Sequence, residues 1–193
     1  QVYAQPASLS AYRAAVQADN PSGFWYLDET SGTTAADASP VAGTNDGTYN
    51  GPHGTLPGFI AGSVAYDSTG PTDYVRILDT FNNGAMATDA FTVEHWLNPD
   101  HPATGPANSL VRGFFAIAGT PAQFIQQNGG NISAGVAAGA GGTVVYGITP
   151  DRWTHVVWTA APGGGGGGGT DLKLYFDGVE VGSHNTGAVA ADN

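Results

Sequence analysis

Apolar and polar residues alternate in short segments along most of this chain. In residues 91–97, the odd positions hold apolar residues and one histidine, whereas the even positions hold Thr92, Glu94 and Trp96. Successive side chains of a β-strand point to opposite faces, so this pattern predicts a strand with one buried face. Trp96 is predicted on the polar face of that strand.

The same pattern predicts one helix followed by many strands. Residues 8–19 place apolar residues at helical spacing after a serine, and Asn20-Pro21 ends the segment. The segments that follow are rich in aromatic and β-branched residues and are bounded by turn residues, as strands are. They are residues 24–28, a short strand near Tyr49, and residues 63–66, 74–78, 91–97, 110–118, 122–127, 132–137, 143–148, 153–160, 171–177 and a last strand that begins at 180.

Glycine marks two of the predicted connections. Asp177-Gly178 is a tight-turn signal between two strands. Residues 163–169 are seven consecutive glycines, and ordering such a run costs the most backbone entropy without burying any side chain. We therefore expect a mobile solvent loop that joins two strands.

Length and composition favour a single all-β domain over residues 1–193. Apolar residues make up 41% of the 193 residues, enough for a core, and the net charge is −11 with only five Lys and Arg. Such a surface repels phosphate, so nucleic acid and anionic membranes are disfavoured as partners. Insertion into a membrane is not expected either, because no apolar run approaches the ~20 residues needed to span a bilayer.

No motif of an enzyme is visible in the sequence. The three glutamates, Glu29, Glu94 and Glu180, do not form the paired pattern of a glycoside hydrolase. A serine-hydrolase elbow, a phosphate-binding loop and a pair of zinc-binding histidines at helical spacing are also missing. The chain lacks cysteine, so a disulfide or thiolate metal site is excluded. We predict that the chain is not an enzyme.

Six motifs stand in a fixed order along the chain, at residues 24–37, 47–51, 73–75, 91–96, 153–157 and 174–179. Together they resemble the laminin-G-like, concanavalin A-like jelly-roll domains of bacterial, archaeal and phage proteins, over roughly residues 12–183. The resemblance implies a jelly-roll sandwich of two antiparallel sheets with a short N-terminal helix. It also implies one or two further strands after residue 183. We therefore expect that the closing strand is truncated, disordered or donated by another chain, which would leave a sheet edge for strand addition or homo-oligomer formation.

The resemblance also suggests a structural calcium ion. Family members often hold calcium near the loop that corresponds to residues 30–37, which points to Asp37, with Asn45 and Asp46 nearby. Calcium takes six to eight oxygen ligands, and a glycine-containing acidic loop can supply them. The alternative is a solvated loop whose aspartates cap turns. If calcium is bound, chelation should lower the melting temperature.

Trp96, Glu94 and Thr92 are the candidate ligand-binding residues. The other tryptophans, Trp25, Trp153 and Trp158, lie within strand patterns and are predicted to pack in the core. Surface tryptophan can stack on sugar rings, and Trp96 shares its predicted face with two polar residues. The strand histidines His95 and His155 are expected to be hydrogen-bonded within the sheet and not to bind a ligand.

These observations favour a non-catalytic recognition or assembly module at an exposed surface, either extracellular or on a virion. In one version it is a carbohydrate-binding or adhesion domain of a secreted or virion protein, with a glycan as partner. In the other it is a structural component of a phage tail, capsid or filament that contacts other subunits without binding glycan. A glycan-active enzyme is a distant third alternative.

Overall fold

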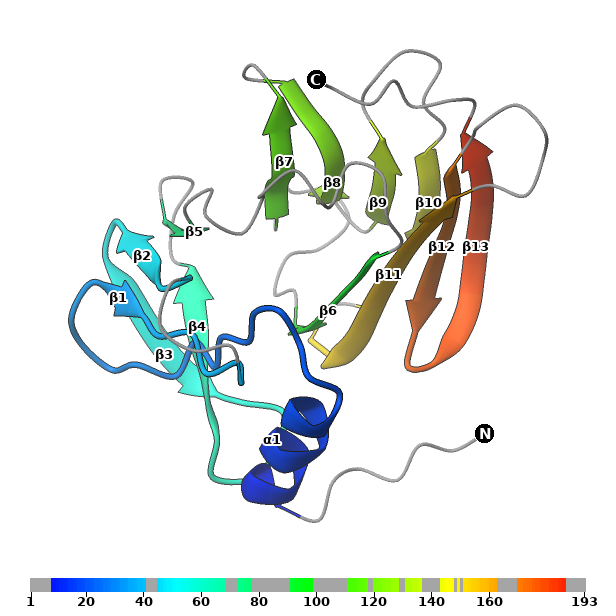
Figure 1. The fold of residues 1–193 in the computed structure, drawn as a ribbon. Helices are drawn as coiled ribbons and strands as arrows, with labels where there is room; N and C mark the ends of the chain where they lie inside the picture. Colours follow the sequence, from blue (N-terminus) through cyan, green and yellow to red (C-terminus); the bar gives the residue numbers. More distant parts are fainter. Residues whose placement is uncertain are drawn as a thin grey trace. The chain divides into compact units, whose positions relative to one another are not determined.

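The computed structural model describes most of the chain, and the description below is confined to those residues. They form two compact units, residues 1–83 and 84–193, whose elements Figure 1 labels. That residues 1–193 form one domain stays a prediction, and each unit is described by itself. The described residues are 8–40, 45–68, 73–77, 91–98, 111–117, 120–128, 131–136, 143–147, 149, 151–162 and 170–186.

The N-terminal unit begins with the predicted helix, α1 (Leu9–Ala18). The Ser8 hydroxyl caps it by accepting a hydrogen bond of 3.2 Å from the Ala11 N–H. On its inner side, the Arg13 guanidinium lies 3.6 Å from the centre of the Tyr26 ring and forms an ion pair with Asp28. These contacts attach the helix to the segment that follows it.

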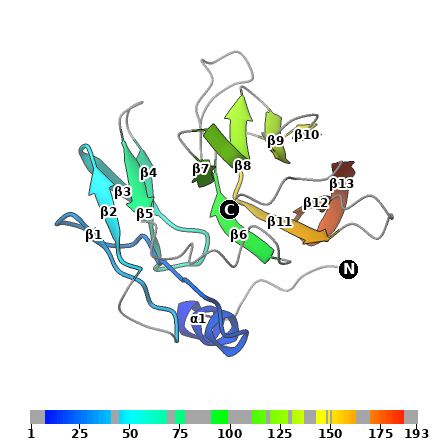
Figure 2. The ribbon, with the colours of Figure 1, turned by 45° about the horizontal axis from the view of Figure 1, so that its top comes forward.

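Five strands complete this unit. β1 (Thr34–Ala35), β2 (Gly47–Asn50) and β5 (Tyr74–Ile77) form an antiparallel sheet in the order β1-β2-β5. β3 (His53–Pro57) pairs with β4 (Val64–Ser68). The rings of Tyr49 on β2 and Tyr66 on β4 lie 5.4 Å apart, so the two sheets pack together there. Figure 2 shows the five strands as one group with α1 beside them.

The structure corrects two predictions in this unit. The strand predicted at residues 24–28 is wrong: Trp25 forms only an isolated bridge with Asp37, and Leu27 has a φ of +54°, which breaks an extended chain. Strand β3 was not predicted, because its glycine and terminal proline lower its strand propensity. Its pairing with β4 supplies the stabilisation that the local sequence lacks.

The C-terminal unit contains two four-stranded antiparallel sheets. The first has the order β13-β12-β11-β6, and its strands match the predicted segments. They are β6 (Phe91–Leu97), β11 (Thr154–Pro162), β12 (Thr170–Phe176) and β13 (Val179–Thr186). The predicted tight turn between β12 and β13 is confirmed, with φ of +49° at Asp177 and +77° at Gly178. Pro162 pairs with Thr170, so residues 163–169 join two paired strand ends. The predicted mobility of those seven glycines lies outside the described residues.

The second sheet has the order β10-β9-β8-β7. Its strands also match the predicted short segments: β7 (Val111–Ile117), β8 (Thr120–Asn128), β9 (Asn131–Val136) and β10 (Thr143–Gly147). β10 contacts β12 and β13 of the first sheet. There the Tyr146 ring meets the Phe176 ring edge-on at 5.4 Å. The unit is therefore an antiparallel sandwich, consistent with the predicted jelly roll.

The core of this unit lies under the first sheet. Val156 and Trp158 on β11 are 0% exposed, and Leu172 and Leu174 on β12 are 1% and 0% exposed. The prediction that Trp158 packs in the core is confirmed, whereas Trp25 and Trp153 are only half-buried. Within the described part of the chain, no helix is long and apolar enough to cross a membrane.

We predict that Trp158→Ala lowers the free energy of unfolding by about 3–5 kcal/mol, because it removes the largest fully buried side chain. Urea denaturation followed by far-UV circular dichroism measures this change. The matched control is Val179→Ala, since Val179 is 59% exposed and its change should stay within about 0.5 kcal/mol. Equal effects of the two substitutions would contradict the assigned core.

Candidate functional site

The outer face of the first sheet carries the predicted ligand-binding residues. Register pairs Trp96 with His155, and Glu94 with Val157, across β6 and β11. Thr92 and Glu94 are exposed and Trp96 is half-buried. Because the alternating positions of β11 carry the core, these residues face away from it. The three predicted residues therefore share one face of one strand, as the sequence pattern indicated.

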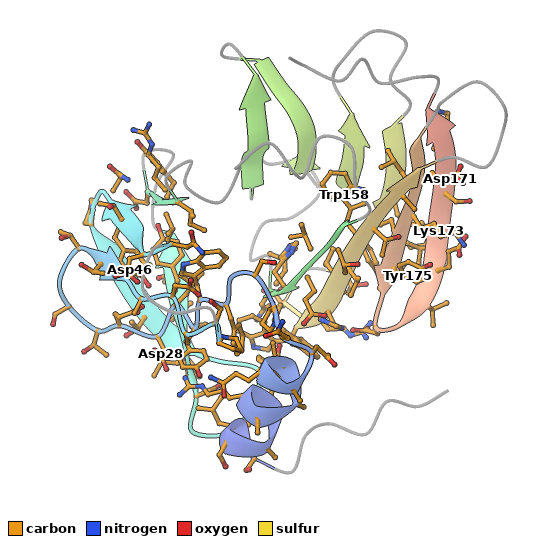
Figure 3. All side chains as sticks on the ribbon, viewed as in Figure 1. Asp28, Asp46, Trp158, Asp171, Lys173 and Tyr175 are labelled. Carbon is orange, nitrogen blue, oxygen red and sulfur yellow. The ribbon has the colours of Figure 1, made fainter. Side chains whose placement is uncertain are left out.

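β12 extends this face with further polar side chains. Figure 3 shows Asp171, Lys173 and Tyr175 following one another along the strand. The Nζ atom of Lys173 lies 3.2 Å from Oε2 of Glu180 on β13. This contact with Glu180 raises the pKa of Lys173. The cation is thus already paired with a carboxylate of the protein.

His155 connects the two main candidate residues. Its ring stacks on the Trp96 ring, with centroids 4.9 Å apart and an interplanar angle of 23°. Its Nε2 atom lies 3.4 Å from Oε2 of Glu94. The neighbouring His155 imidazole lowers the pKa of Glu94, and partial burial opposes that effect only in part. An indole, an imidazole and a carboxylate thus form one cluster, which we call the outer-face cluster (Glu94, Trp96 and His155).

The backbone of His155 is held by the turn between β12 and β13. Its N–H donates to Oδ1 of Asp177 at 3.0 Å, and its carbonyl accepts from the Asp177 N–H at 2.9 Å. The same carboxylate pairs with Arg152. The sequence pattern predicts that His155 is hydrogen-bonded within the sheet and binds no ligand, and it does not show the stacking on Trp96. That contact depends on the pairing of β11 with a strand about sixty positions earlier. The Asp177-Gly178 turn can be predicted from the sequence, but its hydrogen bonds to the His155 backbone cannot.

His95 lies on the opposite face of β6 from Glu94 and Trp96. Both of its ring nitrogens are buried and have no hydrogen-bond partner among the described residues. The expected hydrogen bonds within the sheet are therefore not found there. Burial, with a smaller contribution from His155, lowers the pKa of His95 to about 4. His95 consequently belongs to the packing of the unit and not to the outer-face cluster.

The predicted calcium residues also lie close together, in the N-terminal unit. Asp37 is buried, and its Oδ1 atom accepts hydrogen bonds from the N–H groups of Phe24 at 3.0 Å and Ser39 at 2.9 Å. Its Oδ2 atom accepts from the Ser39 hydroxyl at 3.0 Å. Asp37 therefore ties residues 24 and 39 together through three donors.

Asn45 and Asp46 belong to the same network. Oδ1 of Asp46 accepts from the Asp37 N–H at 2.9 Å. The Asn45 carbonyl accepts from Nε1 of Trp25 at 2.9 Å, and its side-chain amide donates to the Ser22 carbonyl at 3.3 Å. Figure 3 labels Asp46 at the start of β2.

The hydrogen bonds around Asp37 favour capped turns over a calcium ion. Calcium needs oxygen lone pairs directed at the metal, whereas both oxygens of Asp37 face N–H or O–H donors. Among the residues that the structure describes, no group of three or more acidic, histidine or cysteine side chains could hold a metal. The geometry instead matches the alternative in which aspartates cap turns. Calcium binding stays a prediction.

We expect Asp37→Ala to lower the free energy of unfolding by about 1–3 kcal/mol, because buried donors lose their acceptor. Thermal melts with EDTA and with added calcium measure the change. In the capping arrangement the loss is the same in both solutions. The exposed residue Asp19 provides the control, Asp19→Ala. A loss seen only with calcium present would instead favour the metal site.

The buried His95 predicts a dependence of stability on pH. Its folded pKa of about 4 lies below the ordinary value of 6.5, so folding favours the neutral ring. The resulting stabilisation is complete above pH 6.5 and is lost as pH falls from 6.5 towards 4. We expect His95→Leu to flatten the urea midpoint over this range. His184→Ala changes an exposed imidazole and should leave the dependence of the urea midpoint on pH as in the wild type. If His95→Leu showed this same dependence, the burial of a neutral His95 would be contradicted.

Comparison with known proteins identifies the family. Residues 67–193 match the family Laminin_G_3, described as the concanavalin A-like lectin/glucanases superfamily. No curated protein and no solved structure matches the chain significantly. The match covers more than half of the chain, from residue 67 onward, and does not include the motifs at residues 24–37 and 47–51. With its antiparallel sandwich, the chain belongs to the concanavalin A-like lectin/glucanases superfamily.

Proposed function

We propose that this protein is a non-catalytic carbohydrate-binding or adhesion module whose ligand binds at the outer-face cluster. The observation that carries the proposal is a half-buried tryptophan beside a carboxylate on an exposed sheet face. A pyranose ring has one apolar face, formed by its C–H groups, and a rim of hydroxyls. The Trp96 indole can stack on the apolar C–H face of the sugar, and the Glu94 carboxylate can accept hydrogen bonds from its hydroxyls.

The charges on this face favour a neutral glycan. Glu94, Asp171 and Glu180 bring three carboxylates to the face, and Lys173 is paired with Glu180. The whole chain carries a net charge of −11. A sialylated or uronic acid-containing glycan would be repelled at this surface, whereas a neutral sugar can donate its hydroxyls to the carboxylates.

Existing contacts of the three glutamates support a role without catalysis. Oε2 of Glu29 accepts from the Tyr49 hydroxyl at 2.6 Å, and Oε1 accepts from the Ala36 N–H at 2.9 Å. Glu180 is paired with Lys173, and Glu94 with His155. The three glutamates thus have three different sets of partners, and none of these contacts joins two of them as a glycoside hydrolase pair would require.

The proposed setting is a secreted protein or a virion, where a neutral glycan on a cell surface would be the partner. The second version, a structural virion or filament subunit, needs no ligand at the outer-face cluster. It would use the sheet edges for contacts with other subunits. The two versions differ in what Trp96 does, which gives a direct test.

We expect Trp96→Ala to reduce binding of neutral glycans at least about tenfold, equal to ~1.4 kcal/mol. A glycan array finds the ligand, and isothermal titration calorimetry measures the change. The matched control is Tyr146→Ala, because Tyr146 is an exposed aromatic residue, 45% accessible, on the other sheet of the unit. Thermal melts verify that both variants fold.

Three results would overturn this proposal. If the wild-type protein binds no glycan on a broad array and self-associates in light scattering, the structural version is favoured. Glycan binding that Trp96→Ala leaves unchanged would place the ligand elsewhere. Hydrolysis of a bound oligosaccharide, detected by chromatography, would establish the enzyme alternative.

A further inference from the structure

His155 holds the central position in the outer-face cluster. It contacts Trp96 through ring stacking and Glu94 through an ion-pair distance of 3.4 Å. Its side chain is 24% exposed, compared with 43% for Glu94. The imidazole is thus less accessible than the Glu94 carboxylate, and it contacts both side chains that are offered to a ligand. It can fix their spacing without touching a sugar itself.

The sheet makes His155 a rigid support. Its N–H and carbonyl are both bonded to Asp177 in the turn between β12 and β13, and Arg152 holds the Asp177 carboxylate. Its strand, β11, is paired along both edges, with β6 and with β12. A side chain based on such a backbone loses little freedom when a ligand binds, so the groups that it orients are preorganised.

We propose that His155 is the positioning residue of the glycan site, which sets the Trp96 indole and the Glu94 carboxylate at the spacing that a neutral sugar requires. This rests on the proposed function. It assigns to His155 an effect on affinity that acts through its two neighbours. Loss of the imidazole leaves Trp96 and Glu94 in the chain but frees their rotamers, so binding falls although both ligand-contacting groups remain.

The experiment compares His155→Ala and His155→Phe with the wild type, using the neutral glycan that the array identifies. We expect His155→Ala to weaken binding about tenfold. His155→Phe keeps an aromatic ring against Trp96 but cannot pair with Glu94, so it should recover part of the affinity. His184→Ala is the control, and it should keep the wild-type affinity.

A second measurement needs no ligand. The Trp96 ring stacks on the His155 ring, so His155→Ala should change the indole emission spectrum. In a Trp96→Phe background, the same substitution should leave the emission unchanged. An equal change in both backgrounds would overturn the contact on which the proposal rests.

The outcomes separate this proposal from the proposed function. Wild-type affinity in a folded His155→Ala protein would overturn the positioning role alone. A wild-type protein that binds no glycan would overturn both proposals, even if the fluorescence change were present. Weakened binding in His155→Ala with partial recovery in His155→Phe would establish the role.

Discussion

The register of β11 between β6 and β12 is the constraint on which the C-terminal unit depends. This strand places Val156 and Trp158 in the core and His155 on the outer face. A slip of one residue would exchange the two sets, exposing Trp158 and burying the His155 imidazole. The energy that fixes the core therefore also fixes the site. The outer-face cluster needs no stabilisation of its own, because the buried side of the same strands holds it in place.

Local pattern was sufficient for the elements of the C-terminal unit. Neighbouring residues alone determine these elements, and the structure has them where the sequence predicts them. They include the alternating strand at residues 91–97, the longer apolar strands and the Asp177-Gly178 turn. No strand forms at residues 24–28, although their aromatic composition predicts one. There, contacts of Tyr26 and Asp28 with Arg13 and the positive φ of Leu27 determine the conformation.

The candidate site could be predicted in part. Strand alternation placed Thr92, Glu94 and Trp96 on one face without any tertiary information. His155 could not be found in this way, because stacking on Trp96 requires knowing which strands pair and in which register. The Asp37 N–H donates to the Asp46 carboxylate, and calcium binding by Asp37, Asn45 and Asp46 stays a prediction. A capped turn and a metal site differ in what the carboxylate oxygens face. The sequence does not show this, because it depends on where the N–H and O–H donors lie in the folded chain.

The pairing of Pro162 with Thr170 has a practical consequence. The two ends of the glycine segment are adjacent through the sheet itself, so the length of the segment adds little to the entropy of closing it. A fluorescent tag, an affinity peptide or a second binding domain could therefore replace residues 163–169 without shifting β11 or β12. The β11–β12 connection is thus a natural attachment point for making multivalent forms of this protein.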